Sequence, residues 1–301
     1  MWSFIVLAYL IRGLTGYEEL FGHVNPEVYM NISQMISHHG YPSEEYEVLT
    51  EDGYYLTINR IPWGRKNIAP KLVVFLQHGI FGEASHWVEN MANNSLGFIL
   101  ADTGYDVWLG NSRGTSMSQR HQTFSVDQAE FWNFSFHEMA MYDLPATINF
   151  ILKKTKQKQL YYIGYSQGAT IGFIAFSAMP ELSKKIRMFL ALAPVIYATY
   201  VPNNLLKSLM PKFLSPQFQH SPPSYQIKDL SVPTAVWSGG QDTVADPKDI
   251  ELLLSGIVNL VYHCSWADWT HWDLIWGLNA PQRMFFKIIQ LMEKTTYLQN
   301  L

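Results

Sequence analysis

A G-x-S-x-G motif centred on Ser166 lies between an apolar run and a segment of small and apolar residues. Residues 160–165 read as a buried strand, and residues 169–175 read as a buried helix. A serine hydroxyl is a weak nucleophile, so it must project from a tight turn toward a base. Gly164 and Gly168 flank it because a Cβ would obstruct close packing or because the backbone needs φ > 0. The setting predicts a nucleophile elbow, with Ser166 as the nucleophile.

A second G-x-S-x-G motif, centred on Ser112, also follows an apolar run. Residues 115–121 after it are polar and have no buried helical face, so the helix that positions a nucleophile is absent. We therefore interpret Ser112 as a loop serine and expect Arg113 to anchor the loop by hydrogen bonds.

Two later predicted strands are each followed by a candidate for the remaining catalytic groups. In open α/β sheets the chemistry lies beyond the carboxyl ends of the strands. Asp242 follows the apolar run at residues 234–238, and His271 follows the run at residues 259–264. The chain order of serine, acid and histidine is that of the α/β-hydrolases. We expect His271 to take the Ser166 proton while Asp242 orients the imidazole.

Other titratable residues near these strands have less suitable positions. Asp246 and Asp249 are alternative acids, but Asp246 precedes a proline at a predicted helix start, so we interpret both as helix N-terminal residues. His263 lies inside the last predicted strand and is interpreted as a packed or hydrogen-bonded core histidine. Cys264 is the only cysteine, which excludes an intrachain disulfide, and it is interpreted as a packed residue.

An oxyanion hole needs two backbone N–H groups directed at the developing negative charge. Gln167, directly after the nucleophile, is expected to supply one of them. The loop after the predicted strand at residues 71–77 is expected to supply the other, from Ile80.

Predicted strands alternate with helical patterns over most of the 301 residues. Residues 46–50 and 54–61 alternate polar and apolar positions around an Asp-Gly turn, which predicts an N-terminal hairpin. The near-continuous apolar run at residues 71–77 is typical of a strand buried on both faces of a parallel sheet. We therefore predict the α/β class, with an α/β-hydrolase fold on a mostly parallel, doubly wound sheet.

Residues 197–230 break this alternation and contain five prolines. Proline breaks helices and is not accepted in central strands, so we interpret the stretch as a shortened cap or lid. The predicted division is a signal peptide at residues 1–16, a hydrolase core in two parts at residues 17–196 and 231–301, and the cap remnant between them.

The N-terminal sequence and the sequons favour a secreted or lysosomal protein, and the charge bears on the partner class. The formal net charge is -4 and no basic stripe is present, which argues against nucleic acid as a partner.

The apolar stretch at residues 2–14 is too short to span a bilayer and predicts a signal peptide, with an N-terminal core helix as the alternative. Sequons make Asn31, Asn93 and Asn133 candidate glycosylation sites. Metal-ligand spacing such as H-E-x-x-H does not occur, so neither a metal nor a cofactor is expected.

Two aromatic groups accompany the candidate site. They are interpreted mainly as core, with the lining of an acyl pocket as the alternative. Their members are Trp266, Trp269, Trp272 and Trp276 around the histidine, and Phe124, Phe131, Trp132 and Phe134 earlier in the chain.

Longer stretches resemble the acid lipases, the family that contains gastric lipase and lysosomal acid lipase. The matching stretches include residues 30–36, 40–42, 51–54, 76–79, 94–102, 110–114, 142–146, 191–195 and 245–247. The resemblance implies hydrolysis of neutral-lipid esters by a secreted or lysosomal glycoprotein. It also implies that Ser166, Asp242 and His271 are the nucleophile, acid and base, and that Ile80 and Gln167 are the oxyanion donors.

Two departures from the family pattern change this expectation. Where the family usually has histidine before the nucleophile, this chain has Tyr165. The family also inserts a long cap before the acid, whereas only 76 positions (242 minus 166) separate Ser166 from Asp242 here. Most of that cap is therefore absent, and the exposed pocket walls are expected to favour association.

The leading hypothesis is a serine carboxylic ester hydrolase acting on acylglycerols, cholesteryl esters or simpler esters, with a lipid–water interface as a partner surface. A catalytically silent, lipid-binding homologue is the alternative that the missing cap favours. An acyltransferase that uses the same acyl-enzyme is a third hypothesis, because water and alcohols compete for one intermediate.

Overall fold

The computed structural model describes residues 25–66, 72–201 and 225–299. The predicted signal peptide and most of the predicted cap remnant lie outside these residues, so both stay predictions, as does the domain division. Within the described ranges, no helix combines the length and the apolar character needed to cross a bilayer.

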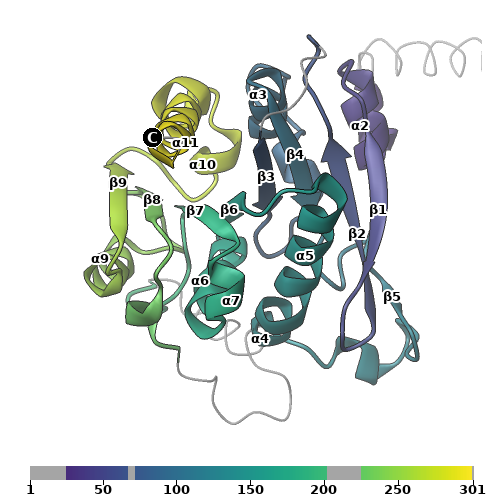
Figure 1. Ribbon diagram of the computed structural model, residues 1–301. Helices are drawn as coiled ribbons and strands as arrows, with labels where there is room; N and C mark the ends of the chain where they lie inside the picture. The colour runs from purple at the N-terminus through teal and green to yellow at the C-terminus, as the bar shows by residue number, and fades with distance from the viewer. Residues whose placement is uncertain (1–24, 67–71, 202–224, 300–301) are drawn as a thin grey trace, which may run out of the picture.

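A single mixed sheet lies at the centre of the described fold (Figure 1). Its order is β1-β2-β4-β3-β6-β7-β8-β9, and β5 pairs with β2 beside this path. The strands are β1 (Glu44–Leu49), β2 (Tyr54–Ile61), β3 (Leu72–Gln77), β4 (Tyr105–Gly110), β5 (Arg120–His121), β6 (Leu160–Tyr165), β7 (Ile186–Leu192), β8 (Thr234–Gly239) and β9 (Leu260–Trp266). The first two form the predicted antiparallel hairpin, and every pair from β4 to β9 is parallel. The expected mostly parallel sheet is therefore confirmed.

Helices lie over both faces of the sheet (Figure 1). They are α2 (Ile32–His38), α3 (Leu96–Asp102), α4 (Phe136–Glu138), α5 (Leu144–Thr155), α6 (Gln167–Ala178), α7 (Pro180–Ser183), α9 (Pro247–Gly256), α10 (Asp273–Trp276) and α11 (Phe286–Gln299). Two π-helical segments, η4 (Met139–Asp143) and η6 (Pro281–Phe285), precede α5 and α11.

The central strands feed two separate hydrophobic cores. In β6, Tyr161 and Ile163 belong to the core beneath α2, α3, α10 and α11, whereas Leu160 and Tyr162 belong to the core beneath α4, α5, α6 and α7. Successive side chains of a strand point to opposite faces, so a strand covered on both sides must be apolar throughout. This explains why β3 and β6 read as near-continuous apolar runs.

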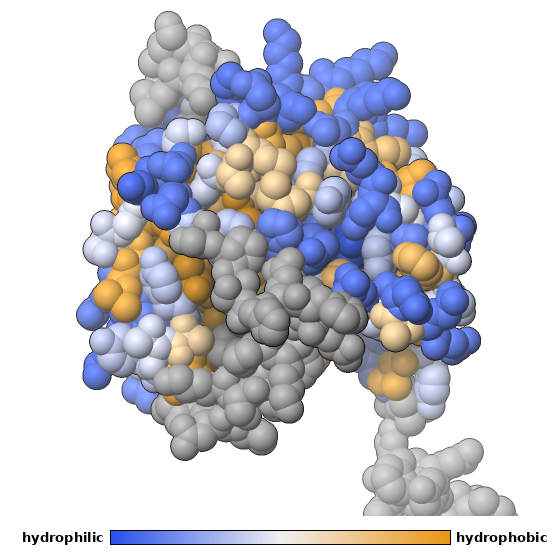
Figure 2. Space-filling model, turned by 90° about the horizontal axis from the view of Figure 1, so that it is seen from below, coloured by the Kyte–Doolittle hydropathy of each residue, from blue (hydrophilic) through white to orange (hydrophobic). Residues whose placement is uncertain are grey.

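The sheet ends at β9, which lies at its edge and is only half covered. His263 in this strand is exposed, so its interpretation as a core histidine is wrong, because an edge strand turns alternate residues to solvent. Cys264 is partly buried and packs against the core, as expected. Val258 is 76% exposed and Val261 45%. Hydrophobic side chains also gather toward the left of Figure 2, the side on which α9 and β9 lie in Figure 1.

Candidate active site

The turn between β6 and α6 holds Ser166 in a strained backbone conformation. Its φ is 52° and its ψ is −117°, whereas neither flanking glycine has a positive φ. Close packing explains the glycines: a Cβ at Gly164 would lie 2.6 Å from the Gly168 carbonyl oxygen, and one at Gly168 would lie 2.2 Å from that of Gln77. Of the two reasons that the sequence offered for these glycines, close packing is therefore the one that applies.

A chain of hydrogen bonds joins the three predicted catalytic residues. His271 Nε2 lies 2.9 Å from Ser166 Oγ, and His271 Nδ1 lies 2.7 Å from Asp242 Oδ2. The other oxygen of Asp242 accepts from the N–H groups of Val244 and Ala245, both at 2.8 Å. All three catalytic candidates are at most 5% exposed. This arrangement fixes both the orientation of the carboxylate and that of the imidazole.

The alternative acids lie elsewhere, as expected. Asp246 caps the N-terminus of α9 and accepts from the Lys248 N–H. Asp249 lies in the first turn of that helix, where it accepts from the N–H groups of Thr199 and Tyr200. Both carboxylates thus bind backbone donors rather than the candidate histidine.

Tyr165, the departure from the family pattern, contacts the candidate base directly. Its ring lies 5.0 Å from the His271 imidazole, and its hydroxyl donates to the His271 carbonyl oxygen at 3.1 Å. The residue is only 1% exposed, and burial raises the pKa of its hydroxyl. The hydroxyl therefore stays protonated and holds the backbone of the loop that carries the imidazole.

The loop after β3 brings Ile80, the predicted oxyanion donor, beside the elbow. A Cβ at Gly79 would lie 2.8 Å from the Cβ of Ser166, so this loop passes against the candidate nucleophile. His78 fixes the loop: its Nδ1 donates to the Gly79 carbonyl at 2.7 Å, and its Nε2 accepts from the Ser112 N–H at 3.0 Å. These bonds require a neutral imidazole, and burial lowers the pKa of His78 to about 4.

The second G-x-S-x-G motif supports the site rather than forming it. Ser112 is buried, and its hydroxyl accepts from Gln77 Nε2 at 2.9 Å. Arg113 anchors the loop, as expected, through hydrogen bonds to Asp52 and Asp143. Burial raises the pKa of the Asp143 carboxyl to about 6 despite this neighbour.

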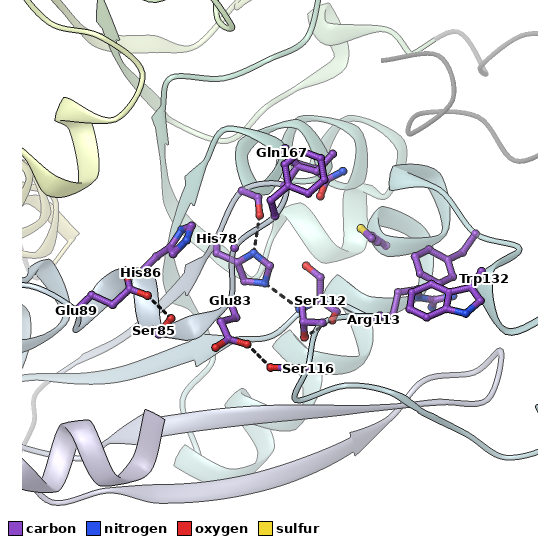
Figure 3. Close-up of a pocket in the computed structure, with 18 residues that line it drawn as sticks. His78, Glu83, Ser85, His86, Glu89, Ser112, Arg113, Ser116, Trp132 and Gln167 are labelled. Atoms are coloured by element: carbon purple, nitrogen blue, oxygen red, sulfur yellow. Dashed lines mark hydrogen bonds between the residues drawn. The ribbon is translucent and has the colours of Figure 1, made fainter. Parts of the chain in front are cut away.

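A cavity of about 670 Å³ lies beside the two predicted oxyanion donors. In Figure 3, His78 and Gln167 lie in the middle of its wall, with Trp132 toward one end and His86 toward the other. Ser166 does not line the cavity and is only 3% exposed. The candidate nucleophile is therefore covered in this structure, with its neighbour Gln167 at the cavity wall.

One end of the cavity, which we call the aromatic end, is lined by Trp132, Phe134 and Met139. Trp132 is 46% exposed, so the interpretation of this aromatic group as core is wrong for Trp132, although it holds for Phe131. A Cβ at Gly114 would lie 2.9 Å from both the Trp132 and the Phe134 rings. The loop of the second motif thus packs directly behind the aromatic end.

The opposite end, which we call the polar end, is lined by Ser85, His86 and Glu89. Ser85 Oγ donates to Glu89 Oε1 at 2.5 Å, and Trp276 Nε1 donates to Glu89 Oε2 at 3.1 Å. The His86 imidazole lies 5.0 Å from the Trp276 ring, and burial lowers its pKa. Sequence reasoning missed this end because its residues form no motif and meet Trp276 only through the fold.

The three candidate glycosylation sites, Asn31, Asn93 and Asn133, are all exposed. An attached glycan would therefore project into solvent. Among the described residues, no group of three or more His, Cys, Asp or Glu side chains is arranged to hold a metal ion.

Two family profiles match the sequence, the partial alpha/beta-hydrolase lipase region at residues 32–91 and the alpha/beta hydrolase fold at residues 73–221. Lysosomal acid lipase/cholesteryl ester hydrolase from Homo sapiens is 44% identical over 369 residues, which cover 90% of this chain and 92% of that protein. The chain belongs to the acid lipase family. The predicted fold, resemblance and enzyme class, a carboxylic ester hydrolase, are thereby confirmed at the level of the family.

Other members of the acid lipase family align over almost the whole chain. Gastric triacylglycerol lipase from Homo sapiens is 40% identical over 395 residues, covering 98% of this chain and 99% of that protein. Lipase member M from Homo sapiens is 40% identical over 393 residues, covering 98% of this chain and 93% of that protein. The shortest of these three alignments, the one with lysosomal acid lipase, spans 369 positions, whereas this chain has only 301 residues. At least 68 positions of that alignment therefore have no counterpart in this chain. A shortened cap agrees with this difference.

Solved structures share the fold at low sequence identity. A putative lipase from Acinetobacter baumannii has a TM-score of 0.64 at 14% identity, covering 92% of this chain and 99% of that one. An esterase from Pyrococcus furiosus has a TM-score of 0.61 at 16% identity, covering 86% and 95%. These structures support the fold and carry no argument about substrate.

Proposed function

We propose that this acid lipase homologue is a serine ester hydrolase that acts on neutral lipids through an acyl-enzyme. The observation that carries the proposal is the hydrogen-bonded chain from Ser166 through His271 to Asp242. A buried carboxylate that binds Nδ1 leaves Nε2 as the proton acceptor, and that nitrogen faces the serine hydroxyl.

The geometry supports a two-step mechanism. Ser166 Oγ attacks the ester carbonyl carbon while its proton passes to His271 Nε2, and the carbonyl oxygen takes the negative charge. The N–H groups of Ile80 and Gln167 are the proposed donors to that oxygen. The tetrahedral intermediate then breaks its bond to the alcohol oxygen, which receives the proton from His271. Water attacks the acyl-enzyme by the same route and releases the acid.

The substrate class comes from the relatives. One is named a cholesteryl ester hydrolase and another a triacylglycerol lipase, so esters of neutral lipids are the proposed substrates. The same relatives support a lysosomal or secreted location, with the signal peptide and glycosylation at Asn31, Asn93 and Asn133 as part of the proposal. The exposure of all three asparagines supports modification.

Hydrolysis of short- and long-chain esters by purified protein, beside Ser166→Ala, tests the proposal between acidic and neutral pH. We expect the variant to lose at least about 1,000-fold in turnover, because the nucleophile is the first reacting group. Equal activity of the two proteins would exclude a role for Ser166. Activity on dissolved esters without activity on emulsified triglyceride would identify an esterase that works without a full cap.

A catalytically silent, lipid-binding homologue is the second candidate, favoured by the 3% exposure of Ser166 and by the missing positions. A fluorophosphonate probe separates the two functions, because only a serine activated by its base reacts covalently with the probe. Labelling of the wild-type protein and not of Ser166→Ala supports the hydrolase. Lipid binding without labelling supports the silent homologue.

A further inference from the structure

The polar end of the cavity carries groups that the proposed hydrolysis does not use. Backbone N–H groups serve the oxyanion, and the aromatic end offers an apolar wall to an acyl chain. Ser85, His86 and Glu89 add hydrogen-bonding side chains that neither task requires. Each Glu89 oxygen accepts one bond from a protein donor, and a carboxylate oxygen has a second lone pair for a further donor.

The polar end lies on the side of the cavity from which the candidate base approaches. Trp272 follows His271 directly, with its ring 5.7 Å from the imidazole, and stacks on Trp276 at 5.2 Å. Trp276 in turn contacts both His86 and Glu89. The leaving alcohol must lie within reach of the base that protonates it. This directs the alcohol toward the polar end and the acyl chain toward the aromatic end, which lies opposite (Figure 3).

The charges of the lining favour donors over acceptors. Glu83 and Glu89 both line the cavity, whereas the guanidinium of Arg113 is paired with two aspartates. The Nδ1 atom of His86 is buried and has no hydrogen-bond partner in the described part of the chain. Glu83 and Glu89 accept hydrogen bonds but form no ion pair with a cationic side chain of the described residues. A cavity lined by such carboxylates attracts hydroxyl groups and repels anions.

We propose that the polar end binds the free hydroxyl groups of a polyol, so that partial acylglycerols, monoacylglycerols above all, are the preferred substrates. The inference rests on the proposed ester hydrolase function. When the bond between the acyl carbon and the glycerol oxygen breaks, the acyl group stays on Ser166 and the glycerol oxygen takes the proton from His271. The two remaining hydroxyls donate to Glu89 and its surroundings. Triacylglycerols and cholesteryl esters have no free hydroxyl and gain nothing at this end.

The test compares two esters of one acid, glyceryl monobutyrate and ethyl butyrate, so that the acyl side cancels. The measured quantity is kcat/KM for the glyceryl ester divided by kcat/KM for the ethyl ester. Glu89→Gln is expected to lower this ratio by about tenfold, the usual scale for one hydrogen bond to a charged group. Ser85→Ala is a second variant at the same end. Glu181→Gln removes an exposed carboxylate on α7 and is expected to leave the ratio unchanged.

The outcomes separate the inference from the function on which it rests. A ratio that falls in Glu89→Gln and not in Glu181→Gln supports the polyol site. Equal ratios in the wild type and both polar-end variants, with hydrolysis still dependent on Ser166, overturn the polyol site alone. Absence of Ser166-dependent hydrolysis of either ester overturns the proposed function and the inference together. Preferential, Glu89-dependent hydrolysis of butyrylcholine overturns the hydroxyl assignment in favour of a cationic alcohol.

Discussion

Replacement of Ser166 by glycine is expected to release backbone strain while it removes activity. The φ of 52° and ψ of −117° match the first central residue of a type II′ turn, which glycine dominates. A side chain held in such a region costs about 1–3 kcal/mol. Glycine loses about 0.4–1 kcal/mol more chain entropy on folding than alanine does. Ser166→Gly should therefore exceed Ser166→Ala by about 0.5–2 kcal/mol in free energy of unfolding.

The alanine variant is the matched control, because both changes remove Oγ and its hydrogen bond to His271. Only the alanine keeps a Cβ in the strained conformation. Urea unfolding monitored by tryptophan fluorescence measures the difference. Calorimetry should show a shift of about 1.5–2 °C in Tm for each kcal/mol in a chain of 301 residues. A glycine variant no more stable than the alanine variant would refute the strain argument.

Three further predictions concern groups around the elbow. Burial lowers the pKa of His78 from 6.5 in the unfolded chain to about 4 in the folded protein. The unfolded state therefore binds more protons between these two pH values. The free energy of unfolding should fall as the pH drops from 6.5 to 4, and it should fall less steeply in His78→Gln. Tyr165→Phe removes the hydroxyl bond to the His271 carbonyl and should lower kcat about 3- to 10-fold with little change in KM. Gly168→Ala places a Cβ 2.2 Å from a backbone oxygen and should cost about 1–3 kcal/mol, whereas Gly256→Ala, with only a side chain 3.8 Å away, should be nearly neutral.

Each of these predictions has a result that contradicts it. Parallel pH profiles of unfolding in the wild type and His78→Gln would mean that this imidazole does not titrate with folding. An unchanged kcat in Tyr165→Phe would show that the Tyr165 hydroxyl does not position His271. Equal stability of the two glycine variants would show that the elbow relaxes around an added methyl group.

The sheet and the three catalytic candidates were predictable because local sequence carries their signals. A strand buried on both faces is mostly apolar, so β3, β4 and β6 stand out as runs. The exception in β4 is Asp106, a buried carboxylate that pairs with Arg60. Ser166 and Asp242 follow two such strands, whereas His271 follows the half-covered edge strand β9. The structure brings the three side chains together.

The rest depended on contacts between distant segments. The exposure of His263 follows from the position of β9 at the sheet edge, which no local pattern states. Tryptophan is a residue type typical of the core, yet Trp132 is partly exposed and lines the cavity. The polar end forms only when Glu89 meets Trp276, 187 positions later. Sequence periodicity indicates whether a helix or strand is buried, but it does not indicate which side chain from a distant segment lines the same cavity.

The bond from the Ser112 N–H to His78 has a practical consequence for mutagenesis. Substitutions at residue 112 that shift the backbone will displace the loop that carries Ile80 and slow turnover, although Ser112 never becomes acylated in the proposed mechanism. A screen that scores only lost activity would then count two nucleophiles in this chain. Mapping the peptide that a covalent inhibitor modifies distinguishes Ser166, the proposed nucleophile, from Ser112, which holds the neighbouring loop through its N–H bond to His78.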